Sequence, residues 1–193
     1  MRRIARLGSL LLAILFAPPV AAADFELPAL MAMLAGVASS KDSFTESKGS
    51  ALLSAPLVLK GTLAYARPDR LEKHVLSPYE EKTVIAGNFV TIENRTLKQK
   101  RSFSLSSSAT VAALIESMRA TLAGDAATLE RHYRTQVEGT RDAWLLTLLP
   151  REEQLAGVVR RIQIAGTRER VKRIEVEEHS GDRSIMLIGP DSP

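Results

Sequence analysis

The chain has 193 residues, no cysteine, and 26 Lys and Arg residues against 22 Asp and Glu residues. The missing cysteine excludes a disulfide framework, a thiolate metal site and a lipidated N-terminal cysteine. Three of the basic residues, Arg2, Arg3 and Arg6, lie in a leader-like segment, so the remainder carries 23 basic and 22 acidic residues, a net charge near +1. That balance gives no indication of nucleic-acid binding, and we expect no nucleic-acid partner.

Residues 1–23 have the three parts of a secretory signal peptide. The arginines come first, an apolar run follows from Leu7 to Phe16, and small residues precede Asp24. The apolar run is too short to span a bilayer, although a retained N-terminal anchor is the alternative. Such a signal predicts a periplasmic protein with one domain, residues 24–193.

The segment after the leader predicts an amphipathic helix of about three turns, because its apolar residues recur at helical spacing. These residues are Leu27, Leu30, Met31, Leu34 and Val37. Alternating apolar and polar residues then predict six strands, at 44–48, 56–66, 71–76, 82–86, 89–93 and 97–105. The clearest strand, 56–66, ends at the corner Arg67-Pro68-Asp69, because proline cannot donate to a strand ladder.

The second half begins with two predicted helices and continues with strands. The helix 109–123 has serines before it as caps and Gly124 after it as a stop, and Asp125 caps a shorter helix at 126–132. Five strands follow, at 133–138, 143–149, 158–164, 171–177 and 183–188. The strand 143–149 is apolar on both faces, so we expect it at the centre of the sheet.

The predicted fold is α+β, with about eleven antiparallel strands in one strongly curved sheet and about three helices that cover its apolar face. In their order and spacing, several segments resemble the periplasmic outer-membrane lipoprotein carrier family, specifically its divergent LolA-like branch. The resemblance covers the mature chain and rests on the segments 44–46, 61–68, 87–92, 122–125, 144–150 and 177–182.

The resemblance implies an unclosed β-barrel under a helical lid that carries the acyl chains of a lipid-modified client across the periplasm. In this family, the arginine of the Arg-Pro corner bonds to the lid helices and holds the empty protein closed, and Arg67 matches that arginine. The alternative for Arg67 is an exposed arginine at the end of a strand. The implied partners are acyl chains of a lipoprotein or another amphiphile, an inner-membrane donor and an outer-membrane acceptor, and the carrier is expected to be a monomer.

A carrier of lipid needs an apolar cavity and an adaptable lid rather than a catalyst. The predicted cavity wall is Leu59, Leu63, Tyr65, Val75, Ile85, Phe89, Phe103, Trp144, Leu146, Ile162 and Ile174. The predicted lid residues are Leu30, Leu34, Leu114 and Met118. For each of these residues, ordinary core packing is the alternative.

The sequence carries no recognisable catalytic motif, so we expect no enzyme activity, no cofactor and no metal. The histidines His74, His132 and His179 lie in separate elements without metal-ligand spacing. Two other functions remain open. The chain could be a structural or interaction domain whose sheet is filled by its own side chains, or a hydrolase of lipid-linked substrates.

Overall fold

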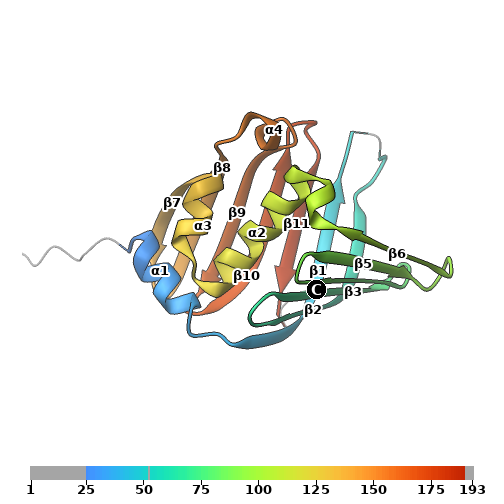
Figure 1. Cartoon of the computed structure of the whole chain (residues 1–193), viewed down its shortest axis with the longest axis horizontal. Coiled ribbons are helices and arrows are strands. Elements are labelled where there is room, and N and C mark those ends of the chain that lie inside the picture. The colour runs from blue at the N-terminus through green and yellow to red at the C-terminus, as the bar shows by residue number, and fades with distance from the viewer. Residues whose placement is uncertain (1–24, 52, 190–193) are drawn as a thin grey trace, which may run out of the picture.

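The computed structural model describes residues 25–51 and 53–189, so the predicted signal peptide lies outside the described residues. Eleven strands form one antiparallel sheet within them (Figure 1). The first six are β1 (Ser39–Gly49), β2 (Leu57–Ala66), β3 (Arg70–Ser77), β4 (Glu81–Ala86), β5 (Phe89–Asn94) and β6 (Gln99–Ser104). The others are β7 (Tyr133–Thr140), β8 (Ala143–Pro150), β9 (Val159–Thr167), β10 (Arg170–Glu178) and β11 (Arg183–Ile188).

The sheet consists of two meanders that meet along a single strand pair. Its order is β6-β5-β4-β3-β2-β1-β11-β10-β9-β8-β7, and the pair β1–β11 places Phe44 opposite Ile188. Strands β4 to β6 run nearly across the direction of β8 to β11 in Figure 1, which shows how strongly the sheet curves. The edge strands β6 and β7 do not pair, so the predicted unclosed barrel is confirmed.

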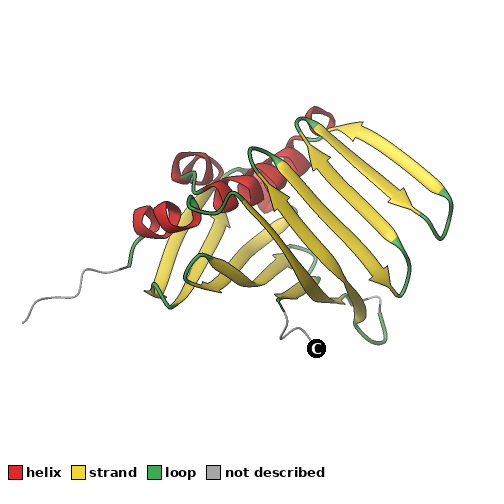
Figure 2. Cartoon of the chain, turned by 90° about the horizontal axis from the view of Figure 1, so that it is seen from below, coloured by secondary structure: helices red, strands yellow, loops and turns green. Residues whose placement is uncertain are grey.

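The helices lie along one side of the curved sheet (Figure 2). They are α1 (Leu27–Leu34), α2 (Ala109–Ala123), α3 (Ala126–His132) and the short α4 (Glu153–Ala156), with a 3-10 turn η1 (Leu105–Ser107) before α2. The predicted caps are confirmed, because Ser108 accepts the Val111 N–H and Asp125 accepts the Thr128 N–H. The segments α4 and η1 were not predicted.

Two sequence expectations need correction. Helix α1 ends at Leu34 after eight residues, so Val37 lies beyond it rather than on its apolar stripe. Strand β8 lies between β7 and β9, second from the edge, rather than at the centre of the sheet. Its inward residues Trp144, Leu146 and Leu148 pack in the core under the helices, whereas Leu145 and Leu149 on the outer face are only half-buried.

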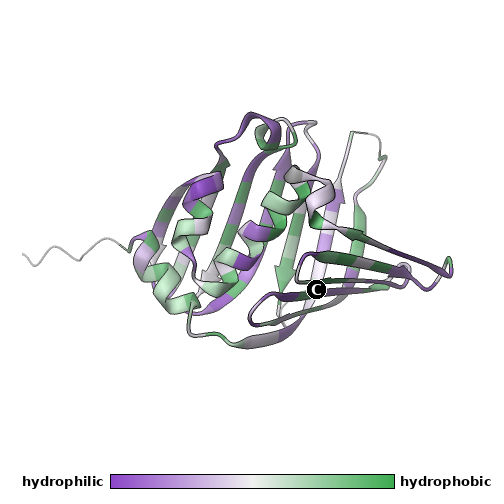
Figure 3. Cartoon of the chain, viewed as in Figure 1, coloured by the Kyte–Doolittle hydropathy of each residue, from purple (hydrophilic) through white to green (hydrophobic). Residues whose placement is uncertain are grey.

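The inner face, meaning the face of the sheet toward the helices, carries three separate apolar clusters. The helix-side cluster joins α1, α2, α3 and α4 to β7, β8 and β9, and includes Leu30, Leu129 and Leu146, which are fully buried. The central cluster is Phe44, Leu59 and Val75. The edge cluster joins Val90 and Leu105 to Ile115 of α2. Figure 3 shows hydrophobic and hydrophilic residues alternating along the strands, as one-sided burial requires.

Gly61 allows the central cluster to pack closely against the sheet. It lies opposite Phe44 of β1, and a Cβ built on it would be 3.0 Å from the Phe44 ring and 1.9 Å from the carbonyl oxygen of His74. Any larger residue would displace both neighbours. Glycine is therefore required here so that the aromatic ring and the β3 backbone can approach the strand closely.

Candidate functional site

The register of the sheet places one row of side chains across six neighbouring strands of the inner face. Directly opposed residues of antiparallel strands point to the same face. The row runs Leu146, Ile164, Ile174, Met186, Glu46, Leu59 from β8 to β2. Five of the six are apolar, and the sixth is a carboxylate near the middle of the sheet.

Most of the predicted wall residues lie on this inner face, but many are packed core. Beneath the helices, Trp144, Leu146 and Ile162 belong to the helix-side cluster, with Ile174 against it, and the predicted lid residues Leu30 and Leu34 of α1 close it from above. The five of these residues that belong to the cluster have side chains that are only 0 to 6% exposed. This end of the inner face is filled by the protein's own side chains.

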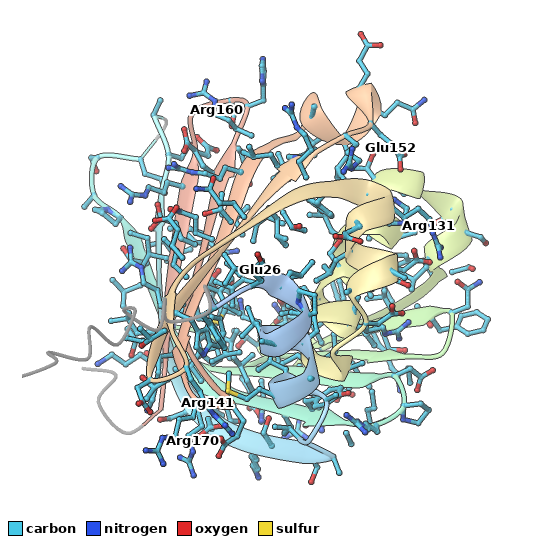
Figure 4. All side chains as sticks on the ribbon, turned by 90° about the vertical axis from the view of Figure 1, so that its left-hand side faces the viewer. Glu26, Arg131, Arg141, Glu152, Arg160 and Arg170 are labelled. Carbon is cyan, nitrogen blue, oxygen red and sulfur yellow. The ribbon has the colours of Figure 1, made fainter. Side chains whose placement is uncertain are left out.

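The centre of the inner face is covered less completely. Leu59 and Val75 are buried, whereas Leu63 packs at their margin and is only half-buried. Leu57, on the same face because it is opposite Lys48, is 37% exposed. Tyr65 is buried, and its hydroxyl has no hydrogen-bond partner among the described residues. Figure 4 shows side chains of the strands and helices projecting into the space between the two layers.

Phe89 and Phe103 lie on opposite faces of the sheet. Ile85 and Val90 are directly opposed and pack in the edge cluster, so Phe89, the neighbour of Val90, points outward and is 59% exposed. The prediction that Phe89 lines the inner face is therefore wrong. Phe103 is opposite Val90, so it does face inward, although it is 37% exposed.

Met118 of α2 occupies the part of the helix between two clusters. It follows Leu114 by four residues and Ile115 by three, so the three side chains share one face. Leu114 packs against the helix-side cluster and Ile115 belongs to the edge cluster. Met118 is nonetheless 42% exposed. The predicted apolar stripe of this helix thus has an uncovered position at its centre.

The carboxylate of Glu46 is 4% exposed and is held by groups from three strands. Its Oε2 accepts a hydrogen bond from Lys73 of β3, and its Oε1 accepts one from Ser184 of β11 at 2.6 Å. Lys48 Nζ lies 3.7 Å from Oε1. Burial by itself raises the pKa of Glu46, but the charge and hydrogen bond of Lys73, with Ser184 and Lys48, outweigh it and hold the pKa below its ordinary value. Glu46 was not predicted as a site residue, because the segment 44–48 has the pattern of a mostly polar strand.

Arg67 joins the corner after β2 to the end of α1. Its Nη2 donates to the carbonyl oxygen of Ala35, the C-cap residue of α1, and its backbone N–H donates to Ala38 at 3.0 Å. The carbonyls of the last helical turn have no partner within a helix, and a guanidinium can satisfy them. The arginine singled out by its Arg-Pro corner therefore bonds to the C-terminal end of α1.

A second arginine makes a similar contact further along the same rim. Arg119 Nη2 of α2 donates to the carbonyl oxygen of Gly87 in the β4–β5 turn at 2.8 Å. The N–H of Gly87 in turn donates to Asp69 in the β2–β3 turn at 2.9 Å. We call the Arg67–Ala35 and Arg119–Gly87 hydrogen bonds the rim contacts. They connect the helices to strand turns through polar groups rather than through apolar packing.

Two surface pockets border these elements. One, of about 310 Å³, lies at the rim between α2 and α3 and is lined in part by Pro68, Arg119 and Arg131. The other, of about 460 Å³, lies at the ends of β7 and β9 and the start of β8, beside Trp144 and Gly166. In Figure 4, Arg141 and Arg170 project outward from the margin of the protein.

In the part of the chain that the structure describes, two of the histidines pair with glutamates at separate places. His74 contacts Glu80 at 3.2 Å, and His132 contacts Glu152 and Glu116 at 2.7 and 3.2 Å. The second set connects α3 to α2 and to the start of α4. Among residues 25–51 and 53–189, no group of three or more His, Asp and Glu side chains is arranged to hold a metal ion.

The family described as outer membrane lipoprotein carrier protein LolA-like matches residues 17–191. The chain belongs to this family. The predicted resemblance is thereby confirmed, and the LolA-like family is one of carrier-type, lipoprotein-binding proteins. No curated protein matches the sequence. Within the described part of this LolA-like chain, no helix is long and apolar enough to cross a membrane.

Three solved structures are similar to the LolA-like chain in fold. A LolA superfamily protein from Nitrosomonas europaea is 12% identical, with 85% of this chain and 93% of that chain covered and a TM-score of 0.44. The CwlD amidase from Clostridioides difficile in complex with the GerS lipoprotein gives 12% identity, 75% and 79% coverage and a TM-score of 0.40. A DUF1329 family protein from Desulfovibrio piger gives 10% identity, 85% and 89% coverage and a TM-score of 0.38.

Proposed function

We propose that this LolA-like protein is a periplasmic carrier. It binds the acyl chains of a lipoprotein or a related amphiphile on its inner face and passes this cargo from an inner-membrane donor to an outer-membrane acceptor. The observation that carries the proposal is the incomplete cover of the apolar inner face. Leu57 and Met118 are 37% and 42% exposed although both lie on sides of their elements that turn toward the other layer.

In the proposed mechanism the helices act as a lid, and the rim contacts break when cargo enters. An exposed hydrogen bond contributes only about 0.5–1.5 kcal/mol net. Each methylene group buried on binding contributes about 0.8 kcal/mol, so a few methylenes of one acyl chain offset the loss of one such bond. In this proposal Arg67 holds α1 against the β2–β3 corner in the empty protein, and cargo displaces it.

The test compares Arg67→Leu with Arg70→Leu in protein purified from the periplasm, using native mass spectrometry with lipid extraction. Arg70 is the matched control, because it lies three residues away and contacts only Glu72 of its own strand among the described residues. We expect substoichiometric acylated cargo in the wild type, more in Arg67→Leu, and no change in Arg70→Leu. If all three proteins are empty and none takes up a fluorescent fatty-acid probe, the carrier function is refuted.

A second function, a structural or interaction domain filled by its own side chains, is favoured by the packing under α1 and α3. Leu30, Leu129 and Leu146 are completely buried without any cargo. The same experiment separates the two functions, because a filled interior takes up no probe in any variant.

A further inference from the structure

Glu46 is out of place in its surroundings. It is the single charged residue in the inner-face row from Leu146 to Leu59, and its direct neighbours in that row are Met186 and Leu59. Burying a carboxylate beside hydrocarbon is unfavourable unless cations and hydrogen bonds compensate it. A buried ion pair can often be replaced by apolar residues of similar volume with no loss of stability. Stability alone therefore does not explain a charged group here.

Lys73 has N–H donors that Glu46 does not occupy, and the lysines beside Glu46 carry more positive charge than it neutralises. Lys73 has three N–H donors, and Glu46 is its only hydrogen-bond acceptor among the described residues. Its ammonium also lies 5.2 Å from the centroid of the Phe44 ring. Lys48 is at 3.7 Å from the same carboxylate. One carboxylate thus fixes two ammonium groups, and the cluster has a net charge of +1.

The cluster lies at the boundary between the buried and the open part of the inner face. Exposure of the side chain rises from 5% for Glu46 to 27% for Lys73 and 47% for Lys48. Lys48 is opposite the exposed Leu57, and Lys73 is opposite the half-buried Leu63. A ligand that lies along these leucines would therefore bring its end to the two ammonium groups.

We propose that Lys73 and Lys48, positioned by Glu46, form a subsite for the anionic headgroup of a lipid. This inference rests on the proposed function and narrows its cargo to amphiphiles with a phosphate or carboxylate close to the acyl chain. The acyl chain lies along Leu57 and Leu63, and the anion accepts hydrogen bonds from the N–H groups that Lys73 does not use for Glu46. Glu46 acts through the lysines and does not touch the cargo.

The experiment uses isothermal titration with four amphiphiles that have a single sixteen-carbon chain and different headgroups. They are hexadecyl phosphate, palmitate, the neutral monopalmitoylglycerol and the cationic hexadecyltrimethylammonium, each below its micelle concentration. The proteins are the wild type, Lys73→Met, Lys48→Met and the control Lys60→Met, whose side chain is exposed on the outer face of β2. A double variant, Glu46→Leu with Lys73→Met, removes both partners of the ion pair. Neither partner is then left as an unpaired buried charge that would impair folding.

For the wild type we expect the anionic amphiphiles to bind about tenfold more tightly than the neutral one, since one charge-assisted hydrogen bond is gained. Lys73→Met and the double variant should lose this preference while their affinity for monopalmitoylglycerol stays the same, and Lys60→Met should keep it. The preference should weaken with added salt. The relative affinities of hexadecyl phosphate and palmitate then distinguish a phospholipid headgroup from a free fatty acid.

Equal binding of all four headgroups by the wild type would overturn the subsite while leaving the carrier function intact. An anion preference that survives in Lys73→Met, Lys48→Met and the double variant would do the same. If no amphiphile binds to any protein, the carrier function itself fails and the subsite fails with it.

Discussion

The guanidinium of Arg119 donates to the carbonyl oxygen of Gly87 at 2.8 Å, and this bond joins the middle of α2 to the turn between β4 and β5. It lies on the same rim as the Arg67 contact with Ala35. The two bonds connect different helices, α2 and α1, to different turns. The helices are therefore bonded to the strand turns at both places, and the resemblance to known carriers pointed only to the Arg67 contact.

Replacing Arg119 by Leu should weaken the attachment of α2 to the β4–β5 turn. We expect the free energy of unfolding to fall by about 1 kcal/mol, the value of one hydrogen bond, and the uptake of a fluorescent fatty-acid probe to become faster. Arg134→Leu, exposed on the outer face of β7, is the control and should change neither quantity. Stopped-flow fluorescence measures the uptake, and an unchanged rate in Arg119→Leu and in the double variant with Arg67→Leu would show that these contacts do not gate entry.

Gly124 fixes the position of α1 against the end of α2. Its φ is +74°, and a Cβ there would be 2.2 Å from the carbonyl oxygen of Met31 and 2.7 Å from the Cβ of Ala35. Gly124→Ala should therefore lower the free energy of unfolding by more than the roughly 1 kcal/mol expected for a left-handed residue alone.

Gly181→Ala is the matched control, because Gly181 has a φ of +92° and nothing within 4 Å of a built Cβ. Urea denaturation of both variants measures the difference. Equal losses of unfolding free energy in the two variants would mean that α1 shifts away at no energetic cost and does not pack firmly against Gly124.

The stability of the protein should depend on the ionisation of Glu46. Its pKa is lowered from an ordinary value of 4.5 by Lys73, Ser184 and Lys48 in spite of burial, so folding favours the ionised form. The resulting stabilisation is complete above the pKa of the unfolded state and is lost as the pH falls through the lower pKa of the folded state.

Glu46→Gln should therefore be less stable than the wild type at neutral pH by about 1–3 kcal/mol, and this gap should close as the pH is lowered below about 4. Thermal or urea denaturation over that pH range measures the gap. The control Glu130→Gln, exposed on α3, should leave the stability at neutral pH close to that of the wild type. A constant gap for Glu46→Gln would mean that its carboxylate titrates alike in the folded and unfolded protein.

Sequence analysis predicted the strands and helices well, because their signals are local. Alternation and turn residues marked all eleven strands, and Ser108 and Asp125 marked the starts of α2 and α3. The local pattern did not determine the inward face of a strand whose apolar residues are compatible with both faces. In β5 the apolar residues Phe89, Val90 and Ile92 are compatible with either face, and only pairing with β4 and β6 selects Val90 as the inward residue.

Relationships across the sheet could not be predicted from local patterns. Ser184 is 138 residues from Glu46, and Lys73 is 27 residues from it. Their convergence depends on the strand order, in which β1 has β2 on one side and β11 on the other. Arg67 could be singled out through its Arg-Pro corner, whereas Arg119 gave no such signal, since an arginine on a predicted helix reads as a solvated residue.

The pairing of β1 with β11 also has a consequence for how the chain acquires its structure. Each meander is built from neighbouring hairpins, but the two can join only when Ile188 reaches Phe44, at opposite ends of the domain sequence. Contacts of such long sequence separation slow folding, because a large loop must close before they form. A chain that emerges from a membrane with its N-terminus first would hold an unpaired β1 edge until its last strand appeared. We therefore expect aggregation during folding to increase sharply when β11 is deleted or its register with β1 is weakened.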